Sequence, residues 1–541
     1  MPQGSPIPRI LPSAPPSVAP GIAAPEAAPT QPVPDIKVAV RSVTVKGATA
    51  YSAAEIHKIT ANLVGPDTPL PKVEAARLAI LNRYRDDGYI LTAVTASLDA
   101  PGNLTYLVTE GRIAEVKLDG DIGPAGTLIL RFLDHLTEVQ PVDIATLEHW
   151  LLLAEEVPGV SLRTVLRPST ENPGALTLVA EVKRQAFSAL LVADNAAYPQ
   201  TGPAEGLLVL GANSFTQFGE KTEVSFYHTS GNTENFGQAS SEFYLGGSGL
   251  KMRLYGGYGP TNPSSPLRDI GYQGTTTVGG ASLSYPVVRR RQQTLDLTVA
   301  FDAIESNTDI DNGAQSISKD SLRVLRLGAA YALHDNLFGD NRGAANAITV
   351  RVSQGLSGLG ASASVGNSGQ PAPQAVNFTK INADISRTQA LFEPWAGASV
   401  SLYGLLSGQY SNDVVPEVEQ FYLGGLALNP GYYSGEVTGD SALAAYSEVR
   451  LQDSWHLSLR DHPFDIGAQL FGFWSWGETW NNHGVQPNER VASAGGGMRL
   501  TLTDHLEFDL IGSSRFVLNP SGSRTVPLQS DALYWRAILH Y

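Results

Sequence analysis

The feature that most constrains this chain is an alternation of apolar and polar residues that recurs from about residue 186 to residue 541. Residues 295–302, 348–352 and 506–510 are clear examples, with Leu, Val, Ile or Phe at every second position and mostly polar residues between them. A period of two is typical of strands, whose side chains point alternately to two faces. Loops rich in Gly, Asn, Ser and Asp separate these segments, and no helical period interrupts them. We therefore expect a large, purely β structure.

A membrane β-barrel explains this pattern better than a soluble sandwich does. A soluble structure of 356 residues would usually divide into several domains with recognisable linkers, and no linker is visible here. In an outer-membrane barrel the apolar face meets lipid, the polar face lines a wet lumen, and closure removes every sheet edge. At roughly 20 to 23 residues per strand with its loop, residues 186–541 provide about sixteen antiparallel strands. Alternate residues Trp535, Ala537, Leu539 and Tyr541 give the final strand one apolar face.

Two small α+β units are predicted before the barrel, over residues 36–112 and 113–185. In the first, strand-like residues precede a helix opened by a capping box of Ser52 and Glu55; a second helix and two paired strands follow. In the second, a helix capped by Asp143 is again followed by two closing strands. The shared order of elements indicates two consecutive copies of one motif.

Residues 1–35 contain eleven prolines, which predicts an extended, polyproline-like linker that acts as a tether. The chain has no apolar run near the 18 residues that a membrane-spanning helix needs. It also opens without a basic and apolar secretory leader, so for an exported protein we expect the leader to have been removed from this numbering.

Composition excludes several classes of function. A formal net charge of −15 and a pI of about 5.1 disfavour nucleic acid as a partner. The absence of cysteine excludes disulfides and thiolate chemistry. The histidines are scattered, and residues 307–313 depart from a calcium loop in the place of their glycine, so we expect neither a metal site nor a cofactor. We expect Arg289, Arg290 and Arg291 to form a charge cluster in the lumen or at its rim.

Residues 421–440, FYLGGLALNPGYYSGEVTGD, resemble the F-x-LGG-x-x-x-VRGY-x-x-G-x-x-x-GD signature of two-partner secretion transporters. These transporters, of the haemolysin and filamentous haemagglutinin secretion type, belong to the Omp85 superfamily. YSAAEI, RYRDDGY and TEGRIAEV look like the first periplasmic POTRA domain of that family, and LLLAEEVPGV looks like part of the second. ADN at 193–195 and SYP at 284–286 look like family barrel strands.

The resemblance implies a loop near 426–442 that folds back into the barrel lumen. Its motif residues here are Gly424, Gly425, Asn429, Pro430, Gly431, Tyr432, Gly435, Gly439 and Asp440. The strand expected to face it carries Phe473, Ser475 and Gly477. Family members often carry an N-terminal helix that plugs the barrel, but the eleven prolines leave no stretch able to form one.

The chain departs from the signature at its charged pair. In the family, an Arg at the loop tip pairs with an Asp of the facing strand; here those places hold Pro430 and Ser475. Loss of one partner alone would leave a buried charge unpaired at a cost of about 3 to 5 kcal/mol, whereas loss of both avoids it. We therefore expect the two positions still to face each other. Phe473 and Ser475 should face the lumen, and Trp474 and Trp476 the lipid.

The resemblance implies an outer-membrane transporter with its POTRA domains in the periplasm. It would capture one unfolded exoprotein, β-helical in type, and translocate it through the barrel pore, working as a monomer in outer-membrane lipid. Folding of the client outside the cell would drive the movement. The POTRA domains would capture the client by strand addition, or else serve as rigid spacers.

Two alternatives remain. An Omp85-type assembly factor would insert other outer-membrane proteins, and its depletion would remove porins broadly rather than one exoprotein. An outer-membrane enzyme such as a lipid hydrolase is disfavoured because no G-x-S-x-G motif or placed Ser/His pair is visible, so we expect no enzymatic activity.

Overall fold

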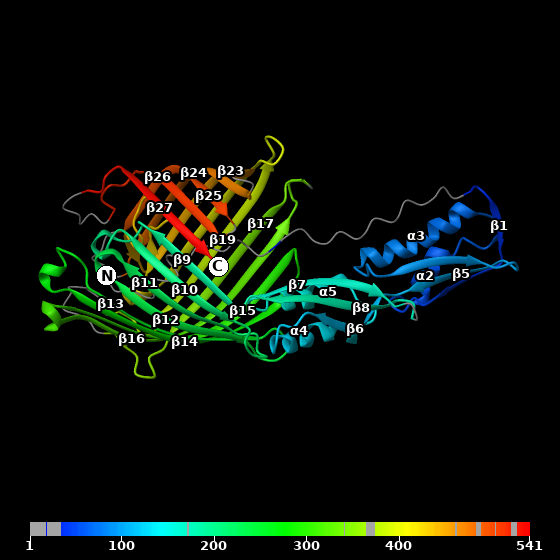
Figure 1. Ribbon diagram of the computed structural model, residues 1–541, viewed down its shortest axis with the longest axis horizontal. Coiled ribbons are helices and arrows are strands. Elements are labelled where there is room, and N and C mark those ends of the chain that lie inside the picture. The colour runs from blue at the N-terminus through cyan, green and yellow to red at the C-terminus, as the bar shows by residue number, and fades with distance from the viewer. Residues whose placement is uncertain are drawn as a thin grey trace.

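In the computed structural model, a β-barrel lies at one end of an elongated molecule and two small α+β units form an arm at the other (Figure 1). The structure describes residues 18, 34–169, 172–339, 341–363, 374–459, 462–482, 488–503, 505–520 and 527–541. Side chains are described outside 456–465. Most of the proline-rich linker predicted over residues 1–35 lies outside the described residues.

The first unit has a three-stranded sheet in the order β2-β5-β4 and a separate pair β1-β3. Its elements are β1 (Lys37–Val40), β2 (Ser42–Lys46), α2 (Ala53–Thr60), β3 (Gly65–Pro69), α3 (Leu70–Asp86), β4 (Ala93–Leu98) and β5 (Asn103–Thr109). The capping box forms as the sequence predicts, because Ser52 N–H donates to Glu55 at 2.9 Å and the Ser52 hydroxyl accepts from Glu55 N–H. Tyr84 and Tyr106 are fully buried between the helices and the sheet.

The second unit repeats this arrangement, with the sheet order β6-β8-β7. Its elements are β6 (Arg112–Asp119), α4 (Ala125–Asp134), the 3-10 helix η1 (His135–Glu138), α5 (Ile144–Glu155), β7 (Val160–Pro168) and β8 (Ala175–Arg184). In each three-stranded sheet the strand that comes first in the chain (β2 or β6) pairs parallel with the last one (β5 or β8), and the remaining strand (β4 or β7) pairs antiparallel with it. Asp143 caps α5 by accepting from Thr146 N–H at 2.8 Å. Among the described residues, no helix has the length and apolar character needed to cross a membrane.

The barrel closes through sixteen strands, counted over the described residues without β18, a two-residue strand at Ser362–Ala363. They are β9 (Phe187–Asp194), β10 (Glu205–Asn213), β11 (Lys221–Thr229), β12 (Asn235–Tyr244), β13 (Lys251–Thr261), β14 (Gln273–Arg289), β15 (Gln293–Ile310), β16 (Gln315–Asp335), β17 (Ala344–Gly355), β19 (Thr379–Phe392), β20 (Ser399–Ser411), β23 (Ser441–Leu459), β24 (His462–Trp480), β25 (Glu489–Thr503), β26 (Leu506–Arg515) and β27 (Asp531–His540). Neighbours are antiparallel, and β27 pairs with β9 to close the ring.

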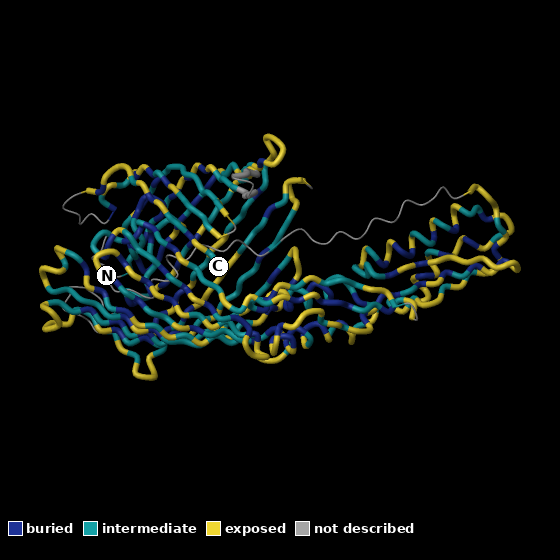
Figure 2. The backbone as a smooth tube through the Cα atoms, viewed as in Figure 1, coloured by how far each residue is buried: buried dark blue, intermediate teal, exposed yellow. Residues whose placement is uncertain are grey.

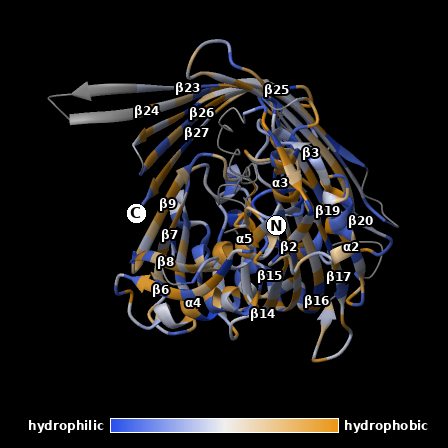
Figure 3. Cartoon of the chain, turned by 90° about the vertical axis from the view of Figure 1, so that its right-hand side faces the viewer, coloured by the Kyte–Doolittle hydropathy of each residue, from blue (hydrophilic) through white to orange (hydrophobic). Residues whose placement is uncertain are grey.

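The barrel is apolar outside, as the alternation predicts. On β15, Leu297 and Val299 are 46% and 48% exposed on the outer face, whereas Asp302 is 8% exposed on the lumen side. In Figure 2 most turns and loops are exposed, and exposed residues also occur among the buried and half-buried residues along the strands. Figure 3 looks along the long axis and shows the strands surrounding the lumen.

The second unit packs directly against the barrel end from which β9 begins. Tyr244 of β12 belongs to the hydrophobic core of that unit, with its ring 5.3 Å from the ring of Phe132. Arg289 Nε lies 3.1 Å from Glu156 Oε1, and Arg291 N–H donates to Glu148 at 3.2 Å. The predicted arginine cluster therefore lies at the barrel rim, where it joins the arm to the barrel.

Candidate functional site

The segment between β20 and β23, residues 412–440, folds into the barrel and is called the lumen loop below. It contains the 3-10 helix η6 (Glu417–Glu419) and a short hairpin of β21 (Phe421–Leu423) and β22 (Val437–Gly439). Because strand direction alternates from β9 onward, this loop enters from the end of the barrel away from the arm. The sequence predicted a loop near 426–442; residues 441 and 442 instead begin β23, and the loop starts earlier.

Two glycines allow the loop to fold tightly. Gly424 has φ of +110°, and a Cβ there would lie 2.0 Å from the Tyr433 carbonyl oxygen. Gly431, at the loop tip, has φ of +118°, and a Cβ there would lie 2.5 Å from the Ser513 hydroxyl and 3.1 Å from Ser493 Cβ. Both positions therefore require glycine, for the backbone conformation and for the close approach.

The loop tip meets the barrel through its own backbone carbonyls. The Pro430 carbonyl accepts hydrogen bonds from the hydroxyls of Ser493 on β25 and Ser513 on β26, the latter at 2.9 Å. Ser475 of β24 lies 2.8 Å from the Ser493 hydroxyl. The structure thus brings the Pro430 and Ser475 positions together through Ser493, rather than in direct contact.

A cation from the barrel also reaches the tip. Arg515, at the end of β26 and 7% exposed, donates from Nε to the Gly431 carbonyl. Its other nitrogens donate to the Gln529 carbonyl at 2.8 Å and the Tyr534 hydroxyl at 3.1 Å. Within the described part of the chain, no carboxylate forms an ion pair with Arg515. The cation is therefore balanced by neutral acceptors, and charge-assisted hydrogen bonds of this kind are stronger than neutral ones.

Tyr432 fixes the tip from its other side. Its side chain is fully buried, and its hydroxyl donates to the Ala492 carbonyl at 2.7 Å and lies 3.0 Å from the Val517 carbonyl. The side chain of Asn429 is also fully buried, but neither its amide nitrogen nor its amide oxygen has a partner among the described residues.

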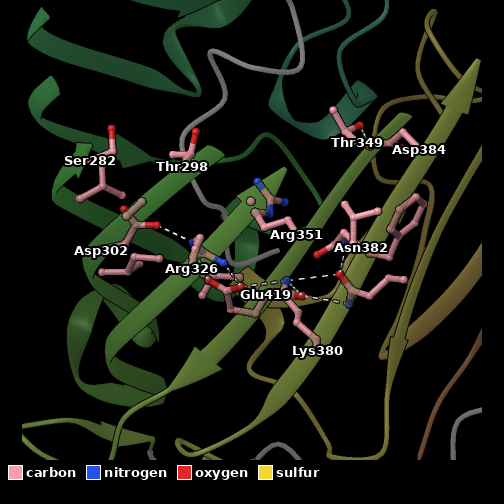
Figure 4. Close-up of a pocket in the computed structure, with 18 of the residues that line it drawn as sticks. Ser282, Thr298, Asp302, Arg326, Thr349, Arg351, Lys380, Asn382, Asp384 and Glu419 are labelled. Carbon is pink, nitrogen blue, oxygen red and sulfur yellow. Dashed lines mark hydrogen bonds and ion pairs between the residues drawn. The ribbon is translucent and has the colours of Figure 1, made fainter. Parts of the chain in front are cut away.

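The loop base, unlike the tip, is held by charge. Glu419 is 3% exposed and lies 2.6 Å from Arg326 of β16 and 2.8 Å from Lys380 of β19. Arg326 also contacts Asp302 of β15 at 2.5 Å. Figure 4 shows Arg326 between the two carboxylates, with Lys380 on the far side of Glu419. Ion pairs this deeply buried are costly to break one partner at a time, so the base is firmly positioned.

Asp440 closes the loop at its C-terminal end. Its carboxylate accepts from the backbone N–H groups of Val415 at 2.9 Å and Asn482 at 2.8 Å. Gln409 of β20 donates to the carbonyls of both Glu419 and Asp440. The two ends of the loop are therefore joined to each other as well as to the barrel.

A cavity of about 960 Å³ lies beside the loop base, lined by residues of β12 to β17, β19 and β20 and by the loop itself. Its polar lining includes Asp384, which accepts from Ser407 and from Thr349 at 3.2 Å. Arg351 extends into the cavity without a dashed contact in Figure 4, and no hydrogen bond or ion pair joins it to another described residue. The cavity therefore presents a cation and several polar groups within a wall that also contains apolar side chains such as Val350.

Strand β24 carries the three residues that the resemblance places opposite the loop. Phe473, Ser475 and Gly477 are buried on the lumen side, and Trp474 is 46% exposed on the outer face. A Cβ at Gly477 would lie 3.0 Å from the side chain of Leu423, so glycine makes room for the loop hairpin. In the described ranges, no three His, Cys, Asp or Glu side chains come together as metal ligands.

Sequence reasoning missed most of the residues that contact the loop. They are Arg326, Lys380, Glu419, Ser493, Ser513 and Arg515. Glu419 stands two residues before the motif and could have been noticed there. The others read only as polar residues on the lumen face of a strand.

The fold and the inserted loop together define an Omp85-type outer-membrane barrel behind periplasmic POTRA domains. A POTRA family model of the ShlB type matches residues 38–111. The family model of the haemolysin secretion/activation protein ShlB/FhaC/HecB matches residues 176–500, more than half of the chain. The chain belongs to this family, and it is a two-partner secretion transporter with a secreted exoprotein partner.

Solved structures agree with this fold. CdiB from Escherichia coli superposes with a TM-score of 0.72 at 18% identity, covering 98% of this chain and 94% of its own. CdiB from Acinetobacter baumannii gives a TM-score of 0.64 at 15% identity, covering 94% of this chain and 90% of its own. A comparison with curated protein sequences found no match.

Proposed function

We propose that this transporter binds one unfolded exoprotein through its two POTRA units and passes it along the lumen, with the lumen loop displaced during passage. One observation carries the proposal. The loop contacts β16 at its base and β26 at its tip, and these strands are seven positions apart in a ring of sixteen. The loop therefore extends across the lumen, and a polypeptide of any length must push it aside.

The arm offers strand edges for capture of the client. In the sheet orders β2-β5-β4 and β6-β8-β7, the strands β4 and β7 each have one partner only. The free N–H and C=O groups of such an edge can pair with an extended client segment. An unfolded exoprotein that becomes a β-helix outside would bury apolar surface there and would not return. The proposal needs no cofactor, nucleic acid or enzymatic step, and one copy in the membrane suffices.

We also propose a division of the chain by role. Residues 1–35 would be a linker, 36–112 and 113–185 the two POTRA units, and 186–541 the barrel. The lumen-facing motif residues, with Phe473, Ser475 and Gly477 opposite, would form the site that opens.

A disulfide across the tip tests the displacement. Gly431→Cys with Ser493→Cys places two Cβ atoms a few tenths of an ångström closer than the usual disulfide spacing of about 3.5–4.5 Å, so a small shift would allow the bond. The chain has no other cysteine. Because cysteine at position 431 strains the loop tip by itself, the test compares the same double variant oxidised and reduced. We expect no secretion from the oxidised form and, on reduction, a return to the level of the single Gly431→Cys variant. Each single-cysteine variant is the control, and full secretion by the oxidised protein would refute the displacement.

Deletion of residues 36–183 tests the capture. We expect a heat-modifiable barrel in the outer membrane and no exoprotein in the culture supernatant. Normal secretion would show that the arm is not the capture element. Comparing supernatants of intact and deleted strains identifies the client, whereas broad loss of porins would indicate an assembly factor.

A further inference from the structure

The tip of the lumen loop has no ionic side chain of its own. Pro430, Gly431 and Tyr432 form the tip, and the described contacts of the first two with the barrel are made by their carbonyl oxygens. The donors come from three barrel side chains: Ser493, Ser513 and Arg515.

We propose that Arg515 is the positioning residue that keeps the lumen loop closed, and that it does so by binding the loop backbone. Ser493 and Ser513 assist it at the preceding carbonyl. The inference deepens the proposed function, because it names the contact that must break before the loop is displaced.

Three observations support Arg515 in this role. Its guanidinium is almost fully buried, so the hydrogen bond to Gly431 is shielded from water. No described carboxylate forms an ion pair with the cation, and its hydrogen bonds go to neutral oxygens, one of which belongs to the loop. Its guanidinium carbon also lies 5.7 Å from the ring centroid of Tyr433, a second loop residue within cation–π range.

This arrangement makes the contact at the Pro430 carbonyl independent of the side chain at position 430. A carbonyl oxygen is present whatever residue occupies position 430, so Pro430→Ala should keep the contact. Arg515→Met should remove the hydrogen bond to the Gly431 carbonyl while preserving much of the apolar volume of the side chain. Arg515→Lys keeps the charge but loses the planar, multiple-donor geometry, so its effect should be intermediate.

Labelling of a single cysteine at the tip measures opening without reference to secretion. Asn429→Cys supplies the probe, because that side chain is buried and its amide makes no hydrogen bond to a described residue. A membrane-impermeant maleimide is added to whole cells that produce the full chain. The matched control is Arg499→Met: Arg499 lies on β25 and pairs with Glu448, and none of its described contacts is to the lumen loop.

We expect Arg515→Met to speed labelling about tenfold or more, the size expected for a lost hydrogen bond to a charged group. Arg499→Met and Pro430→Ala should label within about threefold of the parent, because neither removes a hydrogen bond that the barrel donates to the two tip carbonyls. Heat-modifiable migration should be unchanged in every variant. If Arg515→Met does not reach the membrane, Arg515→Lys and the pair Ser493→Ala with Ser513→Ala provide the test.

Unchanged labelling in folded Arg515 variants would overturn the proposal, and so would an equally large effect of Pro430→Ala. Faster labelling together with blocked secretion in the oxidised tip disulfide supports both proposals. Faster labelling with undiminished secretion in that disulfide variant would retain Arg515 as the closing residue and refute only displacement of the loop.

Discussion

Buried ion pairs at the loop base and hydrogen bonds to backbone carbonyls at its tip give the two ends of one loop different properties. Glu419 is surrounded by two cations in a space that water scarcely reaches. Removal of its charge would leave Arg326 and Lys380 close together and only partly balanced, and repulsion between them is not compensated by solvent. At the tip, by contrast, one buried cation and two hydroxyls bind neutral carbonyls, so opening breaks hydrogen bonds without separating an ion pair.

The first prediction concerns this base. Glu419→Gln should destabilise the barrel by about 3 to 5 kcal/mol, the usual cost of breaking a buried ion pair from one side. The midpoint of urea unfolding, followed by heat-modifiable migration, measures it. The control is Glu223→Gln, which breaks the half-buried ion pair of Glu223 with Lys221. It should lower the free energy of unfolding by less than about 1 kcal/mol.

The second prediction tests whether the positions of the missing charged pair communicate. Pro430→Arg and Ser475→Asp should each impair loop docking, because each alone adds an unpaired charge to the lumen. Together they should do better than the sum of the two, with a coupling of roughly 0.5 to 3 kcal/mol. A double-mutant cycle on barrel stability gives the number. Strict additivity would mean that Ser493, which lies between the two positions, insulates them.

The third prediction concerns Glu110 at the end of the first unit. Burial raises the pKa of this carboxyl, but hydrogen bonds from the Thr49 hydroxyl, Tyr84 hydroxyl and the backbone N–H groups of Ala50 and Thr49 lower it by more. A lowered pKa in the folded state stabilises the unit above the ordinary Glu pKa of about 4.3, and this stabilisation is lost as pH falls below it.

Hydrogen exchange of residues 36–112 in the full chain should therefore speed up between about pH 5 and pH 3 once the intrinsic rates are corrected. Glu110→Gln should flatten that dependence and be less stable at neutral pH. The exposed Glu55, whose pKa is also lowered, supplies the comparison through Glu55→Gln, which should alter the profile less.

At the scale of elements, the sequence predicts strands and helices well where one physical signal repeats. The barrel follows from dozens of alternating positions, and α2 and α5 follow from caps at Ser52 and Asp143. The contacts of the loop tip do not follow, because Ser493, Ser513 and Arg515 are each one more polar residue facing the lumen. These three residues come together only because closure of the barrel and the register of its strands place β25 and β26 beside the loop tip.

Loop boundaries were predictable only in part for a related reason. The glycine-rich signature marks the tip of the lumen loop, whereas Val415 and Glu419 of its approach lack any local pattern. Likewise, the role of Arg289 depends on a helix more than a hundred residues earlier in the chain, so its charge indicates the rim but not the partner.

The fourth prediction concerns the junction between α5 and the barrel. Arg289→Ala removes contacts with Glu156 and Asp296 and leaves both carboxylates half-buried without their cation. We expect faster hydrogen exchange in residues 144–160, with the first unit unaffected. The control is Arg83→Ala, on the exposed pair with Asp87. An unchanged exchange rate would show that the apolar contact of Tyr244 alone maintains the junction.

At the scale of the whole molecule, the chain joins an arm, a barrel and an inserted loop, with the proline-rich linker before them. The arm contacts turns of the barrel at one end, and the loop enters from the other. A client that meets the arm first is therefore already aligned with the lumen axis (Figure 1).

The fifth prediction concerns residues 1–35. Their prolines predict a passive tether rather than a plug, so removing them should leave single-channel conductance in planar bilayers unchanged. A large rise in open-pore current would contradict this. The double variant Gly431→Cys with Ser493→Cys is recorded in the same way, oxidised and reduced. The difference between its two conductances shows how much current changes when the lumen loop is fixed or free.

The sharing of Tyr244 between the barrel and the second unit has a mechanical consequence. Because the core of the second unit includes Tyr244 of the barrel, the arm is fixed to the barrel at one end. A force on the free end of the arm is therefore transmitted to β12 to β15. Arg515 and the two serines stand on β25 and β26, on another arc of the ring. Tension in a captured client would thus strain one side of the barrel while leaving the closing contacts on the other side unloaded.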